Sequence, residues 1–228
     1  MHKILKIGHR GARGYEPENT LSSFSKALEL DVDAVELDVY VCKTGELVVI
    51  HDDKVDRTTN GKGYVVDKSL EDLRELDAGG GQKIPLLSEV LDLVNNKVLV
   101  NIELKGVETA ESVSKIIREY LEEKNWGVEN FLVSSFDHPE LRKFKDFMPK
   151  VNIGALITGI PETYAEFGER LNAYSVNLSA EFINEKFIDD AHKRGLKVLV
   201  WTVNDGDEMK KLKALNVDGM FSDFPDRL

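Results

Sequence analysis

Acidic residues that alternate with apolar ones are the feature of this sequence best suited to chemistry. Glu36 and Asp38 lie two positions apart in VELDV, and Glu103 lies between apolar residues in NIELK. Side chains two positions apart on a strand share one face, and buried carboxylates on one face repel each other unless a cation lies between them. Carboxylate ligands suit a hard ion such as Mg²⁺ or Ca²⁺ better than zinc. These three residues therefore indicate a divalent-cation site.

Two other interpretations of the acidic residues stay open at this point. Glu36 and Asp38 are ordinary surface groups if their strand turns that face to solvent. Glu103 and Lys105 also share a face, and a simple salt bridge would explain that pair. The apolar neighbours of Glu36 and Asp38, which would pack against helices in a parallel sheet, favour the inward orientation.

Histidine and basic side chains follow the same apolar runs. His9 and Arg10 come directly after the first apolar run, at residues 4–8, and His51 comes directly after the run at residues 46–50. A single histidine after a strand is usually structural, but two of them beside other charged groups favour a general acid–base pair. Arg10 and Lys105 are suited to phosphate oxygens, and they would supply local positive charge in a chain whose net charge is −11.

The loop GHRGARG has three glycines spaced three apart, which resembles a phosphate-binding turn at first sight. A dinucleotide fingerprint, however, requires G-x-G-x-x-G running directly into a helix. Here Tyr15, Glu16 and Pro17 separate the glycines from the next helical pattern. We therefore reject a nucleotide-binding loop and expect the glycines to turn the chain tightly beside His9 and Arg10.

These side chains must be positioned by a regular alternation of strands and helices. Eight short apolar runs predict strands at 4–8, 34–41, 98–104, 131–135, 151–157, 173–178, 197–201 and 219–221. Amphipathic stretches predict helices at 21–30, 88–94, 108–124, 139–147, 161–171, 185–194 and 207–215. Eight such units favour an α/β fold of the TIM (β/α)8 barrel type, in which functional residues lie at the carboxyl ends of the strands.

One connection in this barrel is about twice the usual length, between the second and third predicted strands. It contains a further strand-like run at 46–50 and two turn-rich segments, RTTNGKG and LDAGGGQKIP. We predict one domain over residues 1–228 with a small inserted subdomain at about 53–85. A long insertion in a barrel more often forms a lid or a substrate-selecting flap than a segment without function. Little chain follows the last predicted strand, so a final barrel helix has little room.

Composition excludes several classes of partner and location. The net charge of −11 argues against a nucleic-acid or anionic-membrane surface. The single cysteine, Cys42, excludes an intrachain disulfide framework and a cysteine-rich zinc site. The first apolar run is too short for a signal peptide or a membrane span, so we expect a cytoplasmic protein without integral membrane association.

The ordered motifs resemble those of the glycerophosphodiester phosphodiesterase family along nearly the whole chain. They are HRG, PENT, VELDV, VIHDD, RTTNGKG, IPLLSEVL, NIELK, SSF and WTVN. The resemblance implies a TIM barrel with an inserted subdomain and hydrolysis of glycerophosphodiesters to sn-glycerol 3-phosphate and an alcohol. It also implies one divalent cation, Mg²⁺ or Ca²⁺ with Mn²⁺ as a third candidate, and a small-molecule substrate.

The same resemblance implies a role for each matching residue. The cation would be held by Glu36, Asp38 and Glu103, and acid–base catalysis would use His9 and His51. Arg10 and Lys105 would bind the phosphate. The aromatic Trp201, at the pocket mouth, would pack against the alcohol or glycerol part of the substrate. Glu18 and Asn204 are expected to support these residues. Two alternatives are a hydrolase of the same fold that acts on lysophospholipids, and a non-catalytic phosphodiester-binding protein. The sequence predicts no oligomeric state.

Overall fold

Eight parallel strands close into a barrel in the computed structural model, which describes residues 3–228. The barrel strands are β1 (Leu5–Gly8), β2 (Ala34–Val41), β4 (Leu99–Leu104), β5 (Phe131–Ser135), β6 (Asn152–Ile157), β7 (Ser175–Ser179), β8 (Lys197–Trp201) and β9 (Gly219–Ser222). Each pairs with the next in this order, and β1 pairs with both β2 and β9, which closes the ring. The short strand β3 (Leu47–Val49) pairs antiparallel with the last three residues of β2, at its carboxyl end. The predicted (β/α)8 barrel is confirmed, with β3 as an additional strand.

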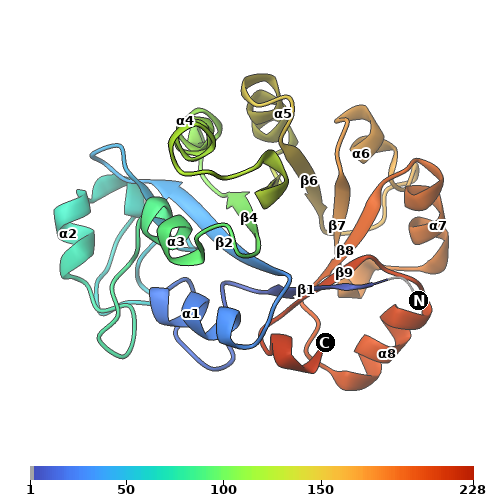
Figure 1. Ribbon diagram of the computed structural model, residues 1–228, viewed down its shortest axis with the longest axis horizontal. Helices are drawn as coiled ribbons and strands as arrows, with labels where there is room; N and C mark the ends of the chain where they lie inside the picture. Colours follow the sequence, from blue (N-terminus) through green and yellow to red (C-terminus); the bar gives the residue numbers. More distant parts are fainter. Residues whose placement is uncertain (1–2) are drawn as a thin grey trace.

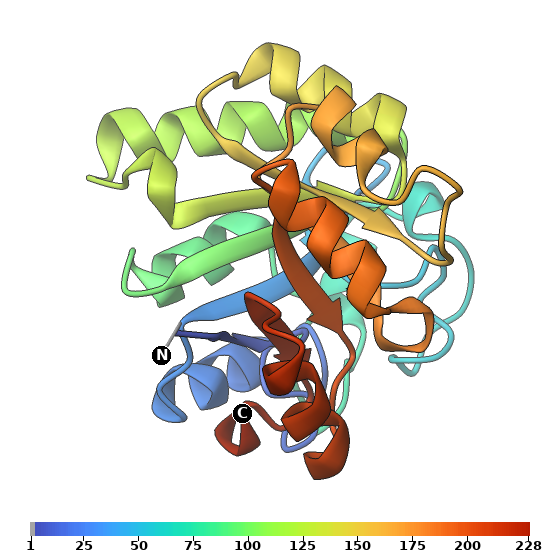
Figure 2. The same cartoon turned by 90° about the vertical axis from the view of Figure 1, so that its right-hand side faces the viewer.

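Helices surround the barrel on its outside, as the two ribbon views show (Figures 1 and 2). They are α1 (Leu21–Glu29), α3 (Leu87–Val94), α4 (Thr109–Glu123), α5 (His138–Phe147), α6 (Glu166–Arg170), α7 (Glu185–Lys193) and α8 (Gly206–Ala214). Outward-facing strand residues such as Val35, Leu37 and Val39 are fully buried beneath this layer. After β9 the chain forms only a short 3₁₀ helix, η4 (Pro225–Arg227), where a complete barrel would have its last helix.

Helix α6 is the element that differs most from its sequence-based expectation. The amphipathic stretch 161–171 predicts a helix of that whole length, but α6 occupies only Glu166–Arg170. Its first residues instead form a turn, in which the Tyr164 amide donates to the Pro161 carbonyl and Tyr164 has a φ of 47°. A positive φ cannot continue an α-helix, so the helix starts only after this residue.

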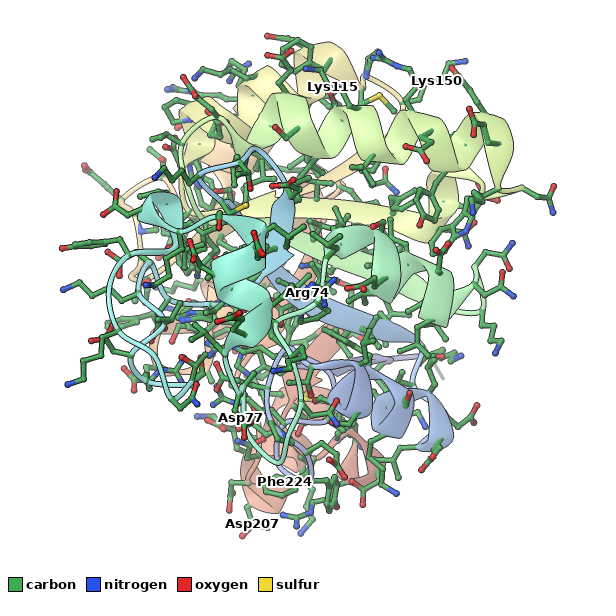
Figure 3. The ribbon with its side chains drawn as sticks, turned by 90° about the vertical axis from the view of Figure 1, so that its left-hand side faces the viewer. Arg74, Asp77, Lys115, Lys150, Asp207 and Phe224 are labelled. Atoms are coloured by element: carbon green, nitrogen blue, oxygen red, sulfur yellow. The ribbon has the colours of Figure 1, made fainter. Side chains whose placement is uncertain are left out.

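The long connection between β3 and α3 packs around a small apolar cluster of its own beside the barrel. This segment includes the 3₁₀ helix η1 (Val65–Asp67) and helix α2 (Leu70–Glu75). The buried residues of the cluster, which also come from β3 and from the turn before it, are Cys42, Val48, Ile50, Val55, Val65, Leu73, Ala78 and Ile84. The sequence analysis did not predict α2, which begins at Ser69 in a reciprocal hydrogen-bonded cap with Asp72. Figure 3 views the molecule from this side.

Strand register fixes which side chains enter the barrel. Asp38 pairs with Glu103 and Glu36 pairs with Asn101, so all four point to the same interior face, with the Asp38–Glu103 pair closer to the carboxyl ends of the paired strands. The intervening apolar residues point outward to the helices. The described residues contain no helix that is long and apolar enough to cross a membrane.

Candidate active site

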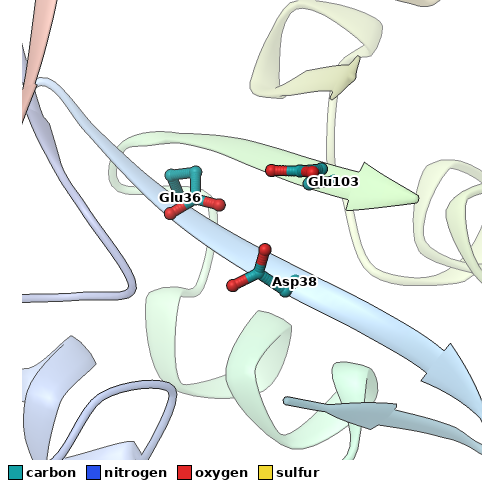
Figure 4. A group of neighbouring side chains, drawn as sticks. All are labelled: Glu36, Asp38 and Glu103. Atoms are coloured by element: carbon teal, nitrogen blue, oxygen red, sulfur yellow. The ribbon is translucent and has the colours of Figure 1, made fainter. Parts of the chain in front are cut away.

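Three acidic side chains meet inside the barrel. Figure 4 shows Glu36 and Asp38 projecting from β2 towards Glu103 on the adjacent strand β4. One carboxylate oxygen from each residue lies within 4.8 Å of the other two. The three residues are 3%, 1% and 8% exposed, respectively, so the interpretation of Glu36 and Asp38 as surface groups is wrong.

The charges of this acidic cluster are only partly compensated by protein groups. Burial and the neighbouring Asp38 raise the pKa of Glu103 to about 7, and burial followed by the charges of Asp38 and Glu103 raises the pKa of Glu36 well above its usual value. Burial alone would also raise the pKa of Asp38, but Lys105 and Arg10 lower it. Oδ1 of Asp38 is buried without a hydrogen-bond partner. Three oxygen donors with this charge conflict and an unpartnered oxygen fit a hard divalent cation.

Lys105 and Arg10 bring positive charge to the same place. Lys105 Nζ donates to Glu103 Oε1 at 2.8 Å and lies 3.6 Å from Asp38 Oδ1, so this pair is part of the cluster and not an isolated salt bridge. Arg10 Nε lies 3.5 Å from Asp38 Oδ2 and is buried without a hydrogen-bond partner. A guanidinium nitrogen of this kind is available to an anionic ligand.

A tight loop after β1 places Arg10 against the acidic cluster. The Arg10 amide donates to Glu36 Oε2 at 2.8 Å, and Arg10 itself has a φ of 52°. Gly11 follows with a φ of 82°, and a Cβ at this position would lie 2.6 Å from the backbone of Ser23. Only glycine fits there, which explains the HRG sequence without any nucleotide.

Each candidate catalytic histidine is held by an aspartate through the same ring nitrogen. His9 Nδ1 lies 2.7 Å from Asp223 Oδ1, and His51 Nδ1 lies 2.5 Å from Asp52 Oδ1. An aspartate at Nδ1 stabilises the tautomer that carries its proton there, which leaves Nε2 of each ring for a ligand. Burial lowers the pKa of both histidines, against the opposing effects of nearby carboxylates. Both imidazoles are therefore biased towards the neutral form.

Asp223 is a site residue that the sequence analysis missed. It follows β9 directly, so the rule that functional groups lie at the carboxyl ends of barrel strands was the signal that pointed to it. Asn204, which we expected to support the site, donates through Nδ2 to Asp223 Oδ2 at 2.8 Å and accepts from the Asp223 amide at 2.9 Å. Arg13 Nε donates to Asp223 Oδ1 at 2.6 Å. These contacts fix the carboxylate that holds His9.

Glu18 lies behind Arg10, away from the cavity. Its Oε1 accepts from Arg10 Nη1 at 2.7 Å, and both of its oxygens accept from Arg57. Burial would raise the pKa of Glu18, but hydrogen bonds and charge from Arg57 and Arg10 lower it to about 2. Glu18 therefore supports a pocket residue without facing the pocket itself.

A cavity of about 160 Å³ opens beside the acidic cluster. Trp201 lies in its wall, where Nε1 donates to the Asn177 carbonyl at 3.1 Å and the indole meets the Phe136 ring edge-on at 5.6 Å. Asn101, Asn177 and Thr202 also line it, although the sequence analysis had not assigned them a role. The residues expected from the sequence that line the cavity are His9, Arg10, Glu36, His51, Glu103, Lys105 and Trp201.

Comparisons with known proteins find relatives over nearly the whole chain. The family described as "Glycerophosphoryl diester phosphodiesterase family" matches residues 9–227. A glycerophosphodiester phosphodiesterase from Caldanaerobacter subterraneus subsp. tengcongensis is 40% identical over 99% of this chain and 96% of its own length. A glycerophosphodiester phosphodiesterase from Bacillus altitudinis is 36% identical over 100% of this chain and 96% of its own length. Among solved structures, an Oleispira antarctica phosphodiesterase in complex with the product sn-glycerol-3-phosphate superimposes with a TM-score of 0.90 and 32% identity, over 97% of this chain and 93% of that chain.

Proposed function

The chain belongs to the glycerophosphoryl diester phosphodiesterase family, and we propose that it hydrolyses glycerophosphodiesters to sn-glycerol 3-phosphate and an alcohol. The observation that carries this proposal is the composition of one cavity. Acidic, cationic and imidazole side chains from β2, from β4 and the residue after it, and from the segments that follow β1 and β3 all line it. Hydrolysis of a phosphodiester needs all of these groups, because the negative charge on its phosphoryl oxygens must be stabilised and protons must be transferred as the P–O bond breaks.

Glu36, Asp38 and Glu103 would hold one divalent cation, Mg²⁺ or Ca²⁺. Support comes from their mutual distances within 4.8 Å and from the unpartnered buried Oδ1 of Asp38. When bound, such a cation supplies Lewis-acid stabilisation of negative charge on phosphoryl oxygens. Among the residues that the structure describes, no cysteine or histidine shares the cluster, which agrees with a hard ion and not with zinc.

Arg10 and Lys105 would bind the phosphoryl oxygens. Arg10 has an unpartnered Nε, and Lys105 has a flexible ammonium group that pairs with Glu103. Both side chains are largely buried, at 10% and 14% exposure, so their hydrogen bonds to an anion would form in a low-dielectric setting. This local positive charge would offset the repulsion that an anionic substrate meets from an acidic protein.

His9 and His51 would transfer the protons. Cleavage of a P–O bond requires that one group accept a proton from the nucleophile and that another donate one to the departing alkoxide. Both rings are fixed at Nδ1 by carboxylates, so the Nε2 atoms are the exchanging sites. The nucleophile is either water or a hydroxyl of the substrate's own glycerol, which would form a cyclic phosphate first.

Trp201 would pack against the glycerol or alcohol part of the substrate. Its indole is held on one side by the Asn177 carbonyl and on the other by Phe136. A rigid aromatic wall of this kind contacts carbon–hydrogen groups at little entropic cost.

A chelator experiment tests the proposed function. The protein is treated with EDTA and then given Mg²⁺, Ca²⁺ or Mn²⁺. Release of glycerol 3-phosphate is followed with the choline, ethanolamine, inositol and glycerol diesters, and release of the free alcohol is followed with lysophospholipids. Hydrolysis that is lost with EDTA and restored by a divalent ion supports the proposal. Substrate binding without metal-restored hydrolysis would instead identify a phosphodiester-binding protein.

A further inference from the structure

Arg57 joins two carboxylates that belong to different parts of the site. It lies in the long connection between β3 and α3, and it donates to Asp52 Oδ2 at 2.7 Å and Oδ1 at 3.0 Å. The same guanidinium donates to Glu18 Oε1 at 2.8 Å and Oε2 at 3.0 Å, although Glu18 follows β1. One arginine therefore makes four hydrogen bonds across the junction between the inserted segment and the barrel.

Each of these carboxylates has a second partner in the cavity. Asp52 Oδ1 is the atom that holds His51 Nδ1, and Glu18 Oε1 is the atom that accepts from Arg10. Arg57 does not itself line the cavity. Arg57 therefore contacts the proposed proton-transfer group His51 through one carboxylate, and the proposed phosphate-binding group Arg10 through the other.

We propose that Arg57 is a positioning residue through which the inserted segment orients His51 and Arg10 for catalysis. The inference rests on the proposed phosphodiester hydrolysis and assigns the insertion a role other than covering the substrate. Docking of the insertion against the loop after β1 would complete the site, because Asp52 and Glu18 reach their final orientation only when the guanidinium lies between them.

The charge balance explains why a cation is needed at this point. Glu18 and Asp52 are held facing one shared cation, and without Arg57 the Glu18 carboxylate would have only Arg10 and the more distant Arg13 as partners. Arg57 donates to both oxygens of Glu18, whereas Arg10 donates only to Oε1 through Nη1, and Arg10 Nε has no hydrogen-bond partner. If Glu18 paired with Arg10 alone, both of its oxygens would compete with the phosphate for that guanidinium.

Geometry explains why the cation is arginine. A planar guanidinium presents donors on two edges and can bind two carboxylates in a two-point manner at once, whereas an ammonium is a point charge on a flexible stem. Arg57→Lys therefore keeps the charge but loses the fixed orientation, and Arg57→Gln loses both.

The test compares these two variants with Arg74→Gln. Arg74 belongs to the same inserted segment, on α2, but it pairs with the single carboxylate of Glu89 away from the cavity. With glycerophosphocholine and saturating Mg²⁺ we expect kcat/KM to fall by about tenfold to a hundredfold in Arg57→Gln, because small misplacements of catalytic groups have effects of this size. Arg57→Lys should recover only part of this loss, and Arg74→Gln should stay within about twofold.

Two further readouts separate positioning from general stability. In protein labelled with ¹⁵N-histidine, His51 should keep its proton on Nδ1 in the wild type and in Arg74→Gln, and should lose this preference in Arg57→Gln. The double variant Arg57→Gln/Asp52→Asn should lose less activity than the product of the two single losses, because both changes act partly through one contact.

Several results would overturn the inference. They are a folded Arg57→Gln protein with kcat/KM within twofold of the wild type, full recovery in Arg57→Lys, or an unchanged His51 tautomer. If Arg57→Gln does not fold, Arg57→Lys carries the same comparison. A wild-type protein that releases no glycerol 3-phosphate would refute the proposed function instead, and the tautomer measurement would still decide the positioning role.

Discussion

Binding of a divalent cation to the three-carboxylate cluster should strengthen as pH rises, with release of protons. Cation ligands must be deprotonated, whereas Glu103 has a pKa of about 7 in the cation-free protein because of burial and the charge of Asp38. A carboxyl of this pKa is ionised to roughly one part in eleven at pH 6 and roughly ten parts in eleven at pH 8. Glu103 alone therefore predicts roughly tenfold weaker binding at pH 6, or about 1.4 kcal/mol. Glu36, whose pKa burial and the charges of Asp38 and Glu103 also raise well above its usual value, steepens the dependence.

Isothermal titration calorimetry with Mg²⁺ or Mn²⁺ measures this effect directly. Titrations at pH 6 and pH 8, each in two buffers of different ionisation enthalpy, give both the affinity and the number of protons released. Glu103→Gln is the control, because it keeps the shape of the side chain and removes the titrating group. It should bind the cation more weakly and lose the part of the pH dependence that Glu103 contributes. Equal affinity at both pH values without proton release, or an unchanged Glu103→Gln protein, would refute the reasoning.

Three shorter predictions concern the histidines and the loop after β1. His9→Ala and His51→Ala should each lower kcat by about 10²- to 10⁴-fold with an unchanged circular dichroism spectrum, and near-normal turnover in both would contradict acid–base catalysis. Burial lowers both histidine pKa values, so the proton-accepting ring becomes protonated only at a pH below 6.5. At saturating cation, the acid-side midpoint of the pH profile of kcat/KM should therefore lie below pH 6.5, and a midpoint above it would argue against this assignment. Gly11→Ala should lower the free energy of unfolding by more than about 1 kcal/mol in urea titrations, and by more than Gly45→Ala, since both have positive φ but only Gly11 lacks room for a Cβ.

The barrel and the acidic cluster were predictable because each depends on a local period. Alternation along VELDV and NIELK places carboxylates on one face, and parallel pairing of neighbouring strands then brings Asp38 beside Glu103. The same rule applied to the last strand would have found Asp223, whose short flanking segment gave little reason to expect a functional residue. Strand ends thus carry most of the sequence information about this site.

The contacts of the inserted segment were not predictable in the same way. Arg57 and Glu18 are 39 positions apart, and they meet only because the insertion packs its own apolar cluster beside β2 and β3. No hydrophobic period records which charged groups meet across such a junction, since both residues lie in irregular segments. The turn that shortens α6 was not predictable for a different reason, because it depends on a single backbone angle at Tyr164.

Charge within the cavity suggests why a cation and a phosphodiester belong to one site. With all three acidic ligands ionised, they outnumber the two basic groups Arg10 and Lys105 by one, so the cluster would repel an anion. With a divalent ion bound, the same cluster carries one net positive charge and attracts it. The surrounding carboxylates of Glu18, Asp52 and Asp223 add three negative charges against the two positive charges of Arg57 and Arg13, so the wider site is neutral with the ion bound and carries two negative charges without it. An acidic protein can thus select an anionic substrate through a small region of opposite sign whose charge depends on the metal.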